Sequence, residues 1–308
     1  MNIVYKSEPE RGRCWQRFLA EQAPDIHFQI WPDIADPERV DCLIAWQPPD
    51  NIMQQFPNLK VLFSVGAGVD QFDYASLPPD LPVVRMVEPG LTRGMVEYVT
   101  FAVLGLHRNM PCYLQQQRQQ VWLAHPGQPA HRRRVGVMGM GTLGEAVLQP
   151  LVQLGFDCAG WSRTGKNLAG VRSFAGKDEL GDFLARSDIL VCLLPLTAAT
   201  EGILNADLFN QLPQGASLVQ VGRGKHLHQD HLLAALDSGQ LSAAVIDVTS
   251  PEPLPADHPF WRHPAIWLTP HIASQTQPES AAQALLDNLR RFGRGEAMTG
   301  VVDRERGY

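Results

Sequence analysis

The chain has 308 residues, a length that favours two domains of ordinary size over a single core. Its 26 basic and 32 acidic side chains are scattered and give a net charge of −6, which argues against binding to nucleic acid or to an anionic membrane surface. The first residues are charged where a secretion signal is apolar, and no apolar run approaches the roughly 18 residues of a membrane span. The five cysteines are well separated and form no C-x-x-C pair, which is typical of reduced thiols. We therefore expect a cytoplasmic protein.

Short apolar runs alternate with longer amphipathic stretches, a pattern that predicts parallel sheets with crossover helices. In the first hundred residues we expect strands at 2–5, 42–45, 61–64 and 82–84 and a helix at 12–23. A long helix at 94–108 is predicted to lead out of this small open α/β unit.

The segment from Pro111 through Trp122 to Pro129 is rich in glutamine and proline, and we expect an arm or loop there. A doubly wound pattern follows, and a final amphipathic helix at 278–292 is predicted to return to the first unit. The pattern consists of strands at 135–138, 157–161, 189–193, 217–220, 243–247 and 266–268 and helices at 143–154, 178–186, 207–211 and 229–238.

A glycine-rich segment lies between the first strand and the first helix of the doubly wound pattern. Gly139, Gly141 and Gly144 fit G-x-G-x-x-G. In dinucleotide-binding folds the first glycine makes a tight turn, the second lets the backbone approach a pyrophosphate, and the third lets helix and strand pack closely. The N-terminus of the helix attracts the diphosphate. This context favours a dinucleotide site over an ordinary turn.

The residue that selects NAD or NADP is expected at the end of the next strand, about 20 positions further on. Residues 160–166 read GWSRTGK, with no acidic side chain to accept a ribose 2′-hydroxyl. A guanidinium flanked by hydroxyls suits a 2′-phosphate, because it forms paired, charge-assisted hydrogen bonds. The cofactor prediction is NADP(H); the alternative is that Arg163 and Lys166 belong to a solvated loop.

Three polar side chains follow successive strand-like runs of the second half: Arg223, Glu252 and His271. Ligands of open α/β sheets bind at the carboxyl ends of the strands, where these residues are placed. Each also has an ordinary interpretation, as an ion-pair partner, a surface-loop acid and a core histidine respectively.

The order of these motifs resembles the D-2-hydroxyacid dehydrogenase family, and most closely its glyoxylate/hydroxypyruvate reductase A branch. The chain departs from the commoner family pattern at Gly222, where alanine is frequent, and at Thr249, where an aromatic residue is frequent. The resemblance rests on the glycine motif, on GRG at 222–224, on DV at 247–248 followed by EPLP at 252–255, on TPH at 269–271, on GAGVD at 66–70, on WSRT at 161–164 and on VDRERGY at 302–308.

The resemblance implies an α/β fold of two domains: a doubly wound Rossmann domain at 101–274 that binds NADP, and a smaller flavodoxin-like substrate domain formed by 1–100 and 275–308. It also implies a homodimer, with an arm around Trp122 reaching the partner. The implied cofactor contacts are Gly139, Gly141, Thr142, Leu143, Gly144, Ser162, Arg163, Thr164, Pro195 and Asp247.

The implied catalytic roles agree with the chemistry of reducing a 2-keto acid, which needs hydride at carbon and a proton at oxygen. Histidine is suited to give that proton near neutrality, so His271 is the expected acid. Glu252 would favour its imidazolium form and fix the ring, and Arg223 would hold the carboxylate and polarise the ketone.

By the same resemblance, Ala67 and Gly68 bind the substrate carboxylate through backbone N–H groups, although a simple tight turn is the alternative. Trp46 either walls a compact pocket or is an ordinary core tryptophan. Three histidines lie close together where a loop enters the helix predicted at 229–238: His226, His228 and His231. No acidic residue or cysteine shares a metal-ligand spacing with them, so no metal is expected.

The predicted function is NADPH-dependent reduction of a small 2-keto acid, glyoxylate or hydroxypyruvate. The alternatives are a reductase of a bulkier keto acid such as phenylpyruvate, and a nucleotide-sensing interaction protein on the same scaffold without turnover.

Overall fold

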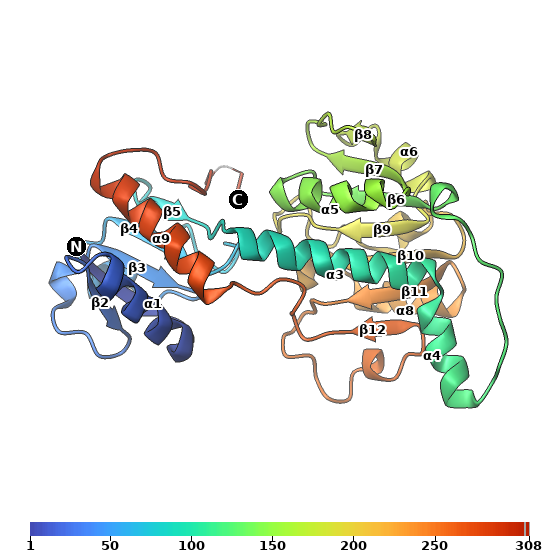
Figure 1. Cartoon of the computed structure of the whole chain (residues 1–308), viewed down its shortest axis with the longest axis horizontal. Coiled ribbons are helices and arrows are strands. Elements are labelled where there is room, and N and C mark those ends of the chain that lie inside the picture. The colour runs from blue at the N-terminus through green and yellow to red at the C-terminus, as the bar shows by residue number, and fades with distance from the viewer. Residues whose placement is uncertain (305, 308) are drawn as a thin grey trace. The chain divides into compact units, whose positions relative to one another are not determined.

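The computed structural model describes residues 1–304, 306 and 307, so two residues of the predicted C-terminal motif, 305 and 308, lie outside the described residues. Contacts divide the chain into two compact units (Figure 1). Unit 1 comprises Met1–Leu91 and Gln275–Tyr308, and unit 2 comprises Thr92–Ser274. The long helix α3 (Pro89–His107) begins in unit 1 and continues in unit 2.

Unit 1 contains, within its described residues, a five-stranded parallel sheet with the order β2-β1-β3-β4-β5. This order is that of flavodoxin-like folds. The buried side chains of α1 and α9 pack on one face of the sheet, and α2 packs on the other. The elements are β1 (Asn2–Lys6), α1 (Pro9–Gln22), β2 (His27–Ile30), η1 (Pro37–Arg39), β3 (Cys42–Ala45), α2 (Ile52–Gln55), β4 (Val61–Ser64), β5 (Val83–Val84) and α9 (Pro278–Gly293).

Unit 2 contains a seven-stranded parallel sheet in its described part, with the order β12-β11-β10-β9-β6-β7-β8. The order reverses between β6 and β9, and such a switch point is where open α/β sheets bind their ligands. The strands are β6 (Arg134–Met138), β7 (Asp157–Ser162), β8 (Val171–Ala175), β9 (Ile189–Cys192), β10 (Ala216–Gln220), β11 (Leu241–Ile246) and β12 (Ile266–Leu268).

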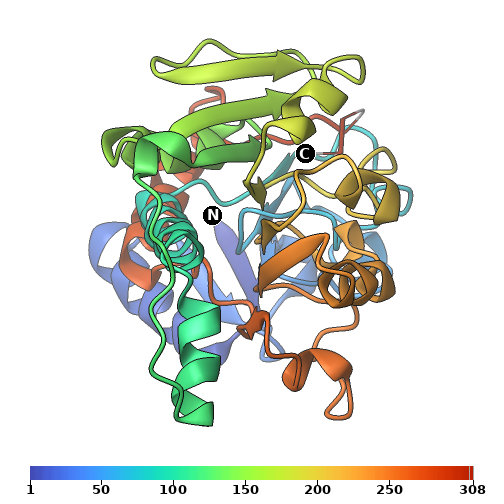
Figure 2. The ribbon, with the colours of Figure 1, turned by 90° about the vertical axis from the view of Figure 1, so that its right-hand side faces the viewer.

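Helices cover both faces of this sheet because side chains alternate along each strand. In β6, Val135 and Val137 pack with α3 and α5, whereas Met138 packs with α6, α7 and α8. Figure 2 shows α3 and α5 on one side of the sheet and α8 on the other. The remaining elements are α4 (Met110–Gln119), η2 (Ala130–Arg132), α5 (Thr142–Gln153), α6 (Leu180–Ala185), α7 (Ala206–Phe209), η3 (Gly224–His226), α8 (Gln229–Asp237) and η4 (Pro259–Trp261).

The expectation of an arm or loop directly after Pro111 is wrong in its first part, where helix α4 forms. Proline in the first turn is compatible with a helix because that N–H needs no partner, and the glutamines after it are good helix formers. Asn109 and Gln120 adopt left-handed conformations and bound α4. The rest of the segment, 121–129, has no helix or strand.

Among the helices of the described residues, none combines the length and the apolar character needed to cross a membrane.

Candidate active site

The glycine motif follows β6 and opens α5, and each glycine meets a different constraint. Gly139 has φ +106°, and a Cβ there would lie 2.7 Å from the carbonyl oxygen of Leu193. A Cβ on Gly144 would lie 1.9 Å from the carbonyl oxygen of Gly139. A Cβ on Gly141 would meet no protein atom within 4 Å, which leaves the backbone open at the start of the helix. These constraints match a tight turn, close helix–strand packing and open access for a diphosphate.

The basic loop follows β7, beside the strand that carries the glycine motif. The hydroxyl of Ser162 is buried and has no hydrogen-bond partner in the described part of the chain. Arg163 and Thr164 are exposed, and no ion pair involves Arg163 among the described residues. Lys166, in contrast, pairs with Glu145 of α5. The loop therefore presents a guanidinium and a hydroxyl without a hydrogen-bond partner among the described residues. Both groups suit the 2′-phosphate of a dinucleotide.

His271 and Glu252 form the hydrogen-bonded pair that the sequence predicted to act together. His271 Nδ1 lies 2.9 Å from Glu252 Oε2, and both side chains are about 38% exposed. A carboxylate only accepts, so Nδ1 carries a proton and Nε2 is the second ring position. The hydrogen bond to Glu252 raises the pKa of His271 above its ordinary value and outweighs the opposing effect of burial. Burial acts to raise the pKa of Glu252, but bonds from His271 and the Thr249 N–H lower it below its usual range.

The segment that carries His271, residues 269–273, is held by the buried side chain of Asp247 at the end of β11. Its Oδ1 accepts from Thr269 Oγ1 at 2.6 Å and from the Ile272 N–H at 2.8 Å. Its Oδ2 accepts from the Ala273 N–H at 2.9 Å. His271 itself has φ +56°, a left-handed conformation that is uncommon outside glycine. The predicted cofactor contact of Asp247 stays a prediction, but its carboxylate binds the His271 segment.

Arg223 follows β10 and is positioned by His226. The His226 ring is fully buried; its Nδ1 accepts from the Arg223 N–H at 3.0 Å, and its Nε2 lies 3.2 Å from the carbonyl oxygen of Pro195. Arg223 Nη1 donates to the Gly222 carbonyl at 2.8 Å. The positive charge of Arg223 acts on both members of the pair: it lowers the pKa of Glu252, and it opposes the raised pKa of His271. All three predicted catalytic residues thus lie in one electrostatic neighbourhood of unit 2.

The predicted substrate residues lie in unit 1, at the ends of β3 and β4. The indole of Trp46 is 36% exposed and packs on Gly66, where a Cβ would lie 3.0 Å from Cζ3. The hydroxyl of Ser64 binds the N–H of Gly66 and the carbonyl of Gly68, which fixes the loop. The N–H groups of Ala67 and Gly68 donate no hydrogen bond to any residue that the structure describes. Two open backbone donors beside an aromatic wall fit a small carboxylate.

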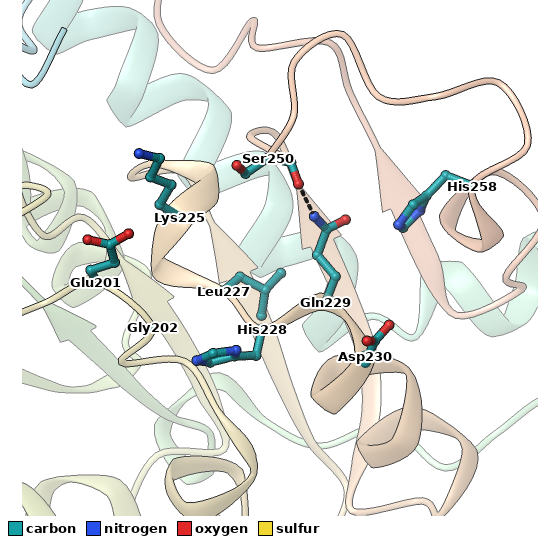
Figure 3. Close-up of a pocket in the computed structure, with 9 residues that line it drawn as sticks. All are labelled: Glu201, Gly202, Lys225, Leu227, His228, Gln229, Asp230, Ser250 and His258. Carbon is teal, nitrogen blue, oxygen red and sulfur yellow. Dashed lines mark hydrogen bonds between the residues drawn. The ribbon is translucent and has the colours of Figure 1, made fainter.

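A separate pocket of about 580 Å³ is lined in part by Ser250, which precedes Glu252 in the same loop (Figure 3). Gln229 Nε2 donates to the Ser250 carbonyl at 2.5 Å, and Lys225 and His228 also line this pocket. No predicted site residue lines it. The described histidine, cysteine, aspartate and glutamate side chains form no group of three that could hold a metal ion.

Two residues of the site were missed by sequence reasoning. Tyr98 of α3 hydrogen-bonds Thr269, and His226 orients the backbone of Arg223. Tyr98 carried one usable signal, because a polar tip on the apolar face of a predicted helix needs a partner. His226 lies only three positions from Arg223, but the second contact of its ring is with a carbonyl 31 positions away, which the sequence does not indicate.

Comparison with known proteins identifies the family of the chain. The family model described as D-isomer specific 2-hydroxyacid dehydrogenase, NAD binding domain, matches residues 100–273. The chain belongs to the D-isomer specific 2-hydroxyacid dehydrogenase family. The predicted family, the α/β fold with its Rossmann-like sheet and the expectation of an oxidoreductase are confirmed.

Individual relatives of this dehydrogenase cover its whole length. The glyoxylate/hydroxypyruvate reductase A of Yersinia enterocolitica is 38% identical over 314 residues and covers 100% of both chains. A D-isomer specific 2-hydroxyacid dehydrogenase from Xanthobacter autotrophicus Py2, solved with NADPH and MES, has a TM-score of 0.94 at 39% identity, covering 100% of this chain and 99% of that one. An NADPH-dependent glyoxylate/hydroxypyruvate reductase from Sinorhizobium meliloti, solved with NADP and sulfate, has a TM-score of 0.92 at 34% identity, with coverage of 100% and 99%.

The histidine–glutamate geometry of this dehydrogenase generates a pH prediction. Glu252→Gln removes the carboxylate that most strongly raises the pKa of His271, so the midpoint of His271 should move to lower pH. The measurement is an NMR titration of the imidazole Cε1–H signal, which is assigned by its loss in His271→Gln. Glu201→Gln, an exposed glutamate of the separate pocket, is the control and should leave the midpoint in place. An unchanged midpoint in Glu252→Gln would contradict the electrostatic coupling.

Proposed function

We propose that this dehydrogenase reduces small 2-keto acids with NADPH, converting glyoxylate to glycolate and hydroxypyruvate to D-glycerate. The observation that carries the proposal is the 2.9 Å bond between His271 and Glu252, with Arg223 close enough to act on both. This arrangement supplies a proton donor and a fixed cation together. The names of the Yersinia and Sinorhizobium relatives support the same substrates.

In this proposal unit 2 binds the cofactor and unit 1 binds the substrate. Gly139, Gly141 and Gly144 hold the diphosphate, and Ser162 with Arg163 holds the 2′-phosphate. NADPH, when bound, supplies hydride to the substrate carbon. Thr142, Leu143, Thr164, Pro195 and Asp247 complete the proposed cofactor contacts.

The residues of the chain handle the proton and the developing charge. His271 is held through Nδ1 by Glu252, so the proton at Nε2 is the one available to the ketone oxygen. Its raised pKa extends to higher pH the range in which the ring keeps this proton. Arg223 holds the carboxylate and stabilises negative charge that grows on the ketone oxygen. As the pH rises through the pKa of His271, the proton is lost and reduction slows.

The open N–H groups of Ala67 and Gly68 are proposed to bind the substrate carboxylate. Trp46, packed against the same loop, limits the space beside it and favours short keto acids. A bulkier substrate such as phenylpyruvate is the alternative within the same chemistry. A sensor without turnover is the alternative of another class, and the paired His271 and Glu252 argue against it.

We also propose that the protein is a cytoplasmic homodimer. Its cysteines are free, as is usual in reducing compartments. Large apolar side chains are exposed on α3, on α4 and in the segment after α4, where the Trp122 side chain is fully exposed. Such a concentration of apolar surface favours an interface with a second copy. Its members are Phe101, Met110, Leu114, Val121, Trp122 and Leu123.

Arg163→Ala tests the 2′-phosphate assignment. Loss of a charge-assisted contact should raise the KM for NADPH by about 10- to 100-fold, while the KM for NADH stays nearly unchanged. Steady-state kinetics with both cofactors measures this. Lys166→Ala is the matched control, because Lys166 already pairs with Glu145 and should matter less. Equal losses with both cofactors would remove the assignment.

His271→Ala tests the acid. Turnover should fall by about 10²- to 10⁴-fold, the usual contribution of general acid catalysis, while NADPH binding followed by fluorescence stays nearly intact. NADPH oxidation is measured with glyoxylate, hydroxypyruvate and phenylpyruvate in parallel. Wild-type turnover in the variant would exclude His271 as the acid. If the unmodified protein binds NADPH tightly but turns over none of the three, the sensor alternative is favoured.

Light scattering tests the homodimer. The 34.1 kDa chain should scatter as a particle of twice that mass, and Phe101→Asp should shift it toward the monomer by placing a charge on an exposed apolar position of the proposed interface. Lys177→Asp, a charge change on an exposed residue outside the proposed interface, should leave the mass as it is. A monomer in the unmodified protein at assay concentration would overturn the proposal.

A further inference from the structure

Tyr98 lies on α3 and reaches the segment that carries His271. Its hydroxyl oxygen is 2.5 Å from Thr269 Oγ1, and Thr269 Oγ1 is 2.6 Å from Asp247 Oδ1. Burial raises the pKa of Tyr98 to about 12, so its hydroxyl keeps a proton throughout the neutral range. A continuous hydrogen-bonded chain therefore joins α3 to the carboxylate at the end of β11.

The direction of this chain follows from the number of protons. A carboxylate only accepts, so Thr269 must give its single hydroxyl proton to Asp247. The oxygen of Thr269 is then left to accept, and Tyr98 must be the donor. Each hydroxyl has one defined role, and this fixes the rotamers of both side chains.

The same carboxylate holds both residues that follow His271. Asp247 accepts from the N–H groups of Ile272 and Ala273, and its own carbonyl oxygen accepts from the His271 N–H at 2.8 Å. These bonds lie on either side of the left-handed residue, where φ is +56°. A residue other than glycine keeps this backbone conformation only if the surrounding contacts hold it there.

We propose that Tyr98 is a positioning residue for His271. Through Thr269 it fixes the Asp247 carboxylate, and the carboxylate fixes the backbone that aims the imidazole at Glu252. The inference deepens the proposed function, on which it rests for the catalytic consequence, but the geometry of the imidazole can be measured without turnover.

The charged groups that act on His271 are Glu252, Arg223 and Asp247. Glu252 acts through a hydrogen bond that depends on the aim of the ring, whereas Arg223 and Asp247 act through charge at longer range. Loosening the His271 segment should therefore weaken the Glu252 bond first. The midpoint of His271 should then move toward lower pH, because that bond is the largest cause of its raised value.

Tyr98→Phe in the full chain is the direct test. It keeps the ring and removes the donor, and we expect kcat to fall by about threefold to tenfold, the effect of one neutral hydrogen bond. NADPH affinity should stay unchanged, and the NMR midpoint of His271 in the cofactor-free protein should fall. Thr269→Val should reproduce both effects, and Thr269→Ser, which keeps the hydroxyl, should restore them.

Thr100→Val is the matched control. Thr100 lies on the same helix, and its buried hydroxyl has no hydrogen-bond partner among the described residues. This variant should alter neither the midpoint nor kcat. Combining Tyr98→Phe with Thr269→Val should cost little more than either change alone, since both interrupt one chain.

Two results would overturn the inference. One is a midpoint and kcat in Tyr98→Phe that match those of Thr100→Val. The other is a lowered melting temperature in Tyr98→Phe with no change of midpoint, which would make Tyr98 a stabilising residue only. Failure of the proposed function is a distinct outcome: the midpoint would fall in Tyr98→Phe as expected, but His271→Ala would keep its turnover.

Discussion

The buried carboxylate of Asp247 is the constraint on which the catalytic half of the molecule depends. A charge taken out of water is costly unless hydrogen bonds replace its hydration, and this one, in a side chain only 2% exposed, receives three. Its three donors all belong to residues 269–273. The hydrogen bonds that stabilise the buried charge are therefore the same bonds that fix the conformation of this segment. The strained conformation of His271 is thereby coupled to the end of a core strand.

Glu252 raises the pKa of His271, while burial and, to a smaller extent, the charge of Arg223 lower it. Glu252 favours the imidazolium directly, through a hydrogen bond at 2.9 Å, while Arg223 opposes it. Without Arg223 the ring would hold its proton more tightly, and without Glu252 it would lose it too early. Because a proton donor works best when its pKa lies near the working pH, the opposing effects of Glu252, burial and Arg223 on the pKa of His271 bear on how well it could act as the acid.

The sequence predicted most of the buried strands because buried parallel strands are continuous apolar runs, as at Cys42–Ala45 and Ile189–Cys192. It did not predict β8, which lies at the edge of its sheet and has no fully buried residue. It also missed α4, since glutamine-rich stretches lack the apolar stripe that marks a helix.

The sequence predicted the residues of the candidate site and the pairing of Glu252 with His271, but not the contacts that hold them from distant parts of the chain. Three polar side chains stand out because each follows an apolar run within a few residues: Arg223, Glu252 and His271. The pairing of Tyr98 with Thr269 spans 171 positions and exists only once α3 packs beside β12, so no local pattern could indicate it. His226 was considered only as a metal ligand, with no metal expected, and its bonds to the Arg223 N–H and the Pro195 carbonyl were not predicted.

Some polar groups of the candidate site are hydrogen-bonded within the chain, and others have no partner among the described residues. Protein interiors pair nearly all of their polar atoms, and the exceptions call for an explanation. The carboxylate of Asp247, the ring of His226 and the hydroxyl of Ser64 are all bonded within the chain. The N–H groups of Ala67 and Gly68 and the hydroxyl of Ser162 have no such bond to any residue that the structure describes. A polar group without a partner does not by itself define a site. The hydroxyl of Thr100 in α3 also has no hydrogen-bond partner among the described residues. What distinguishes the open groups of the site is their place at the carboxyl ends of β4 and β7.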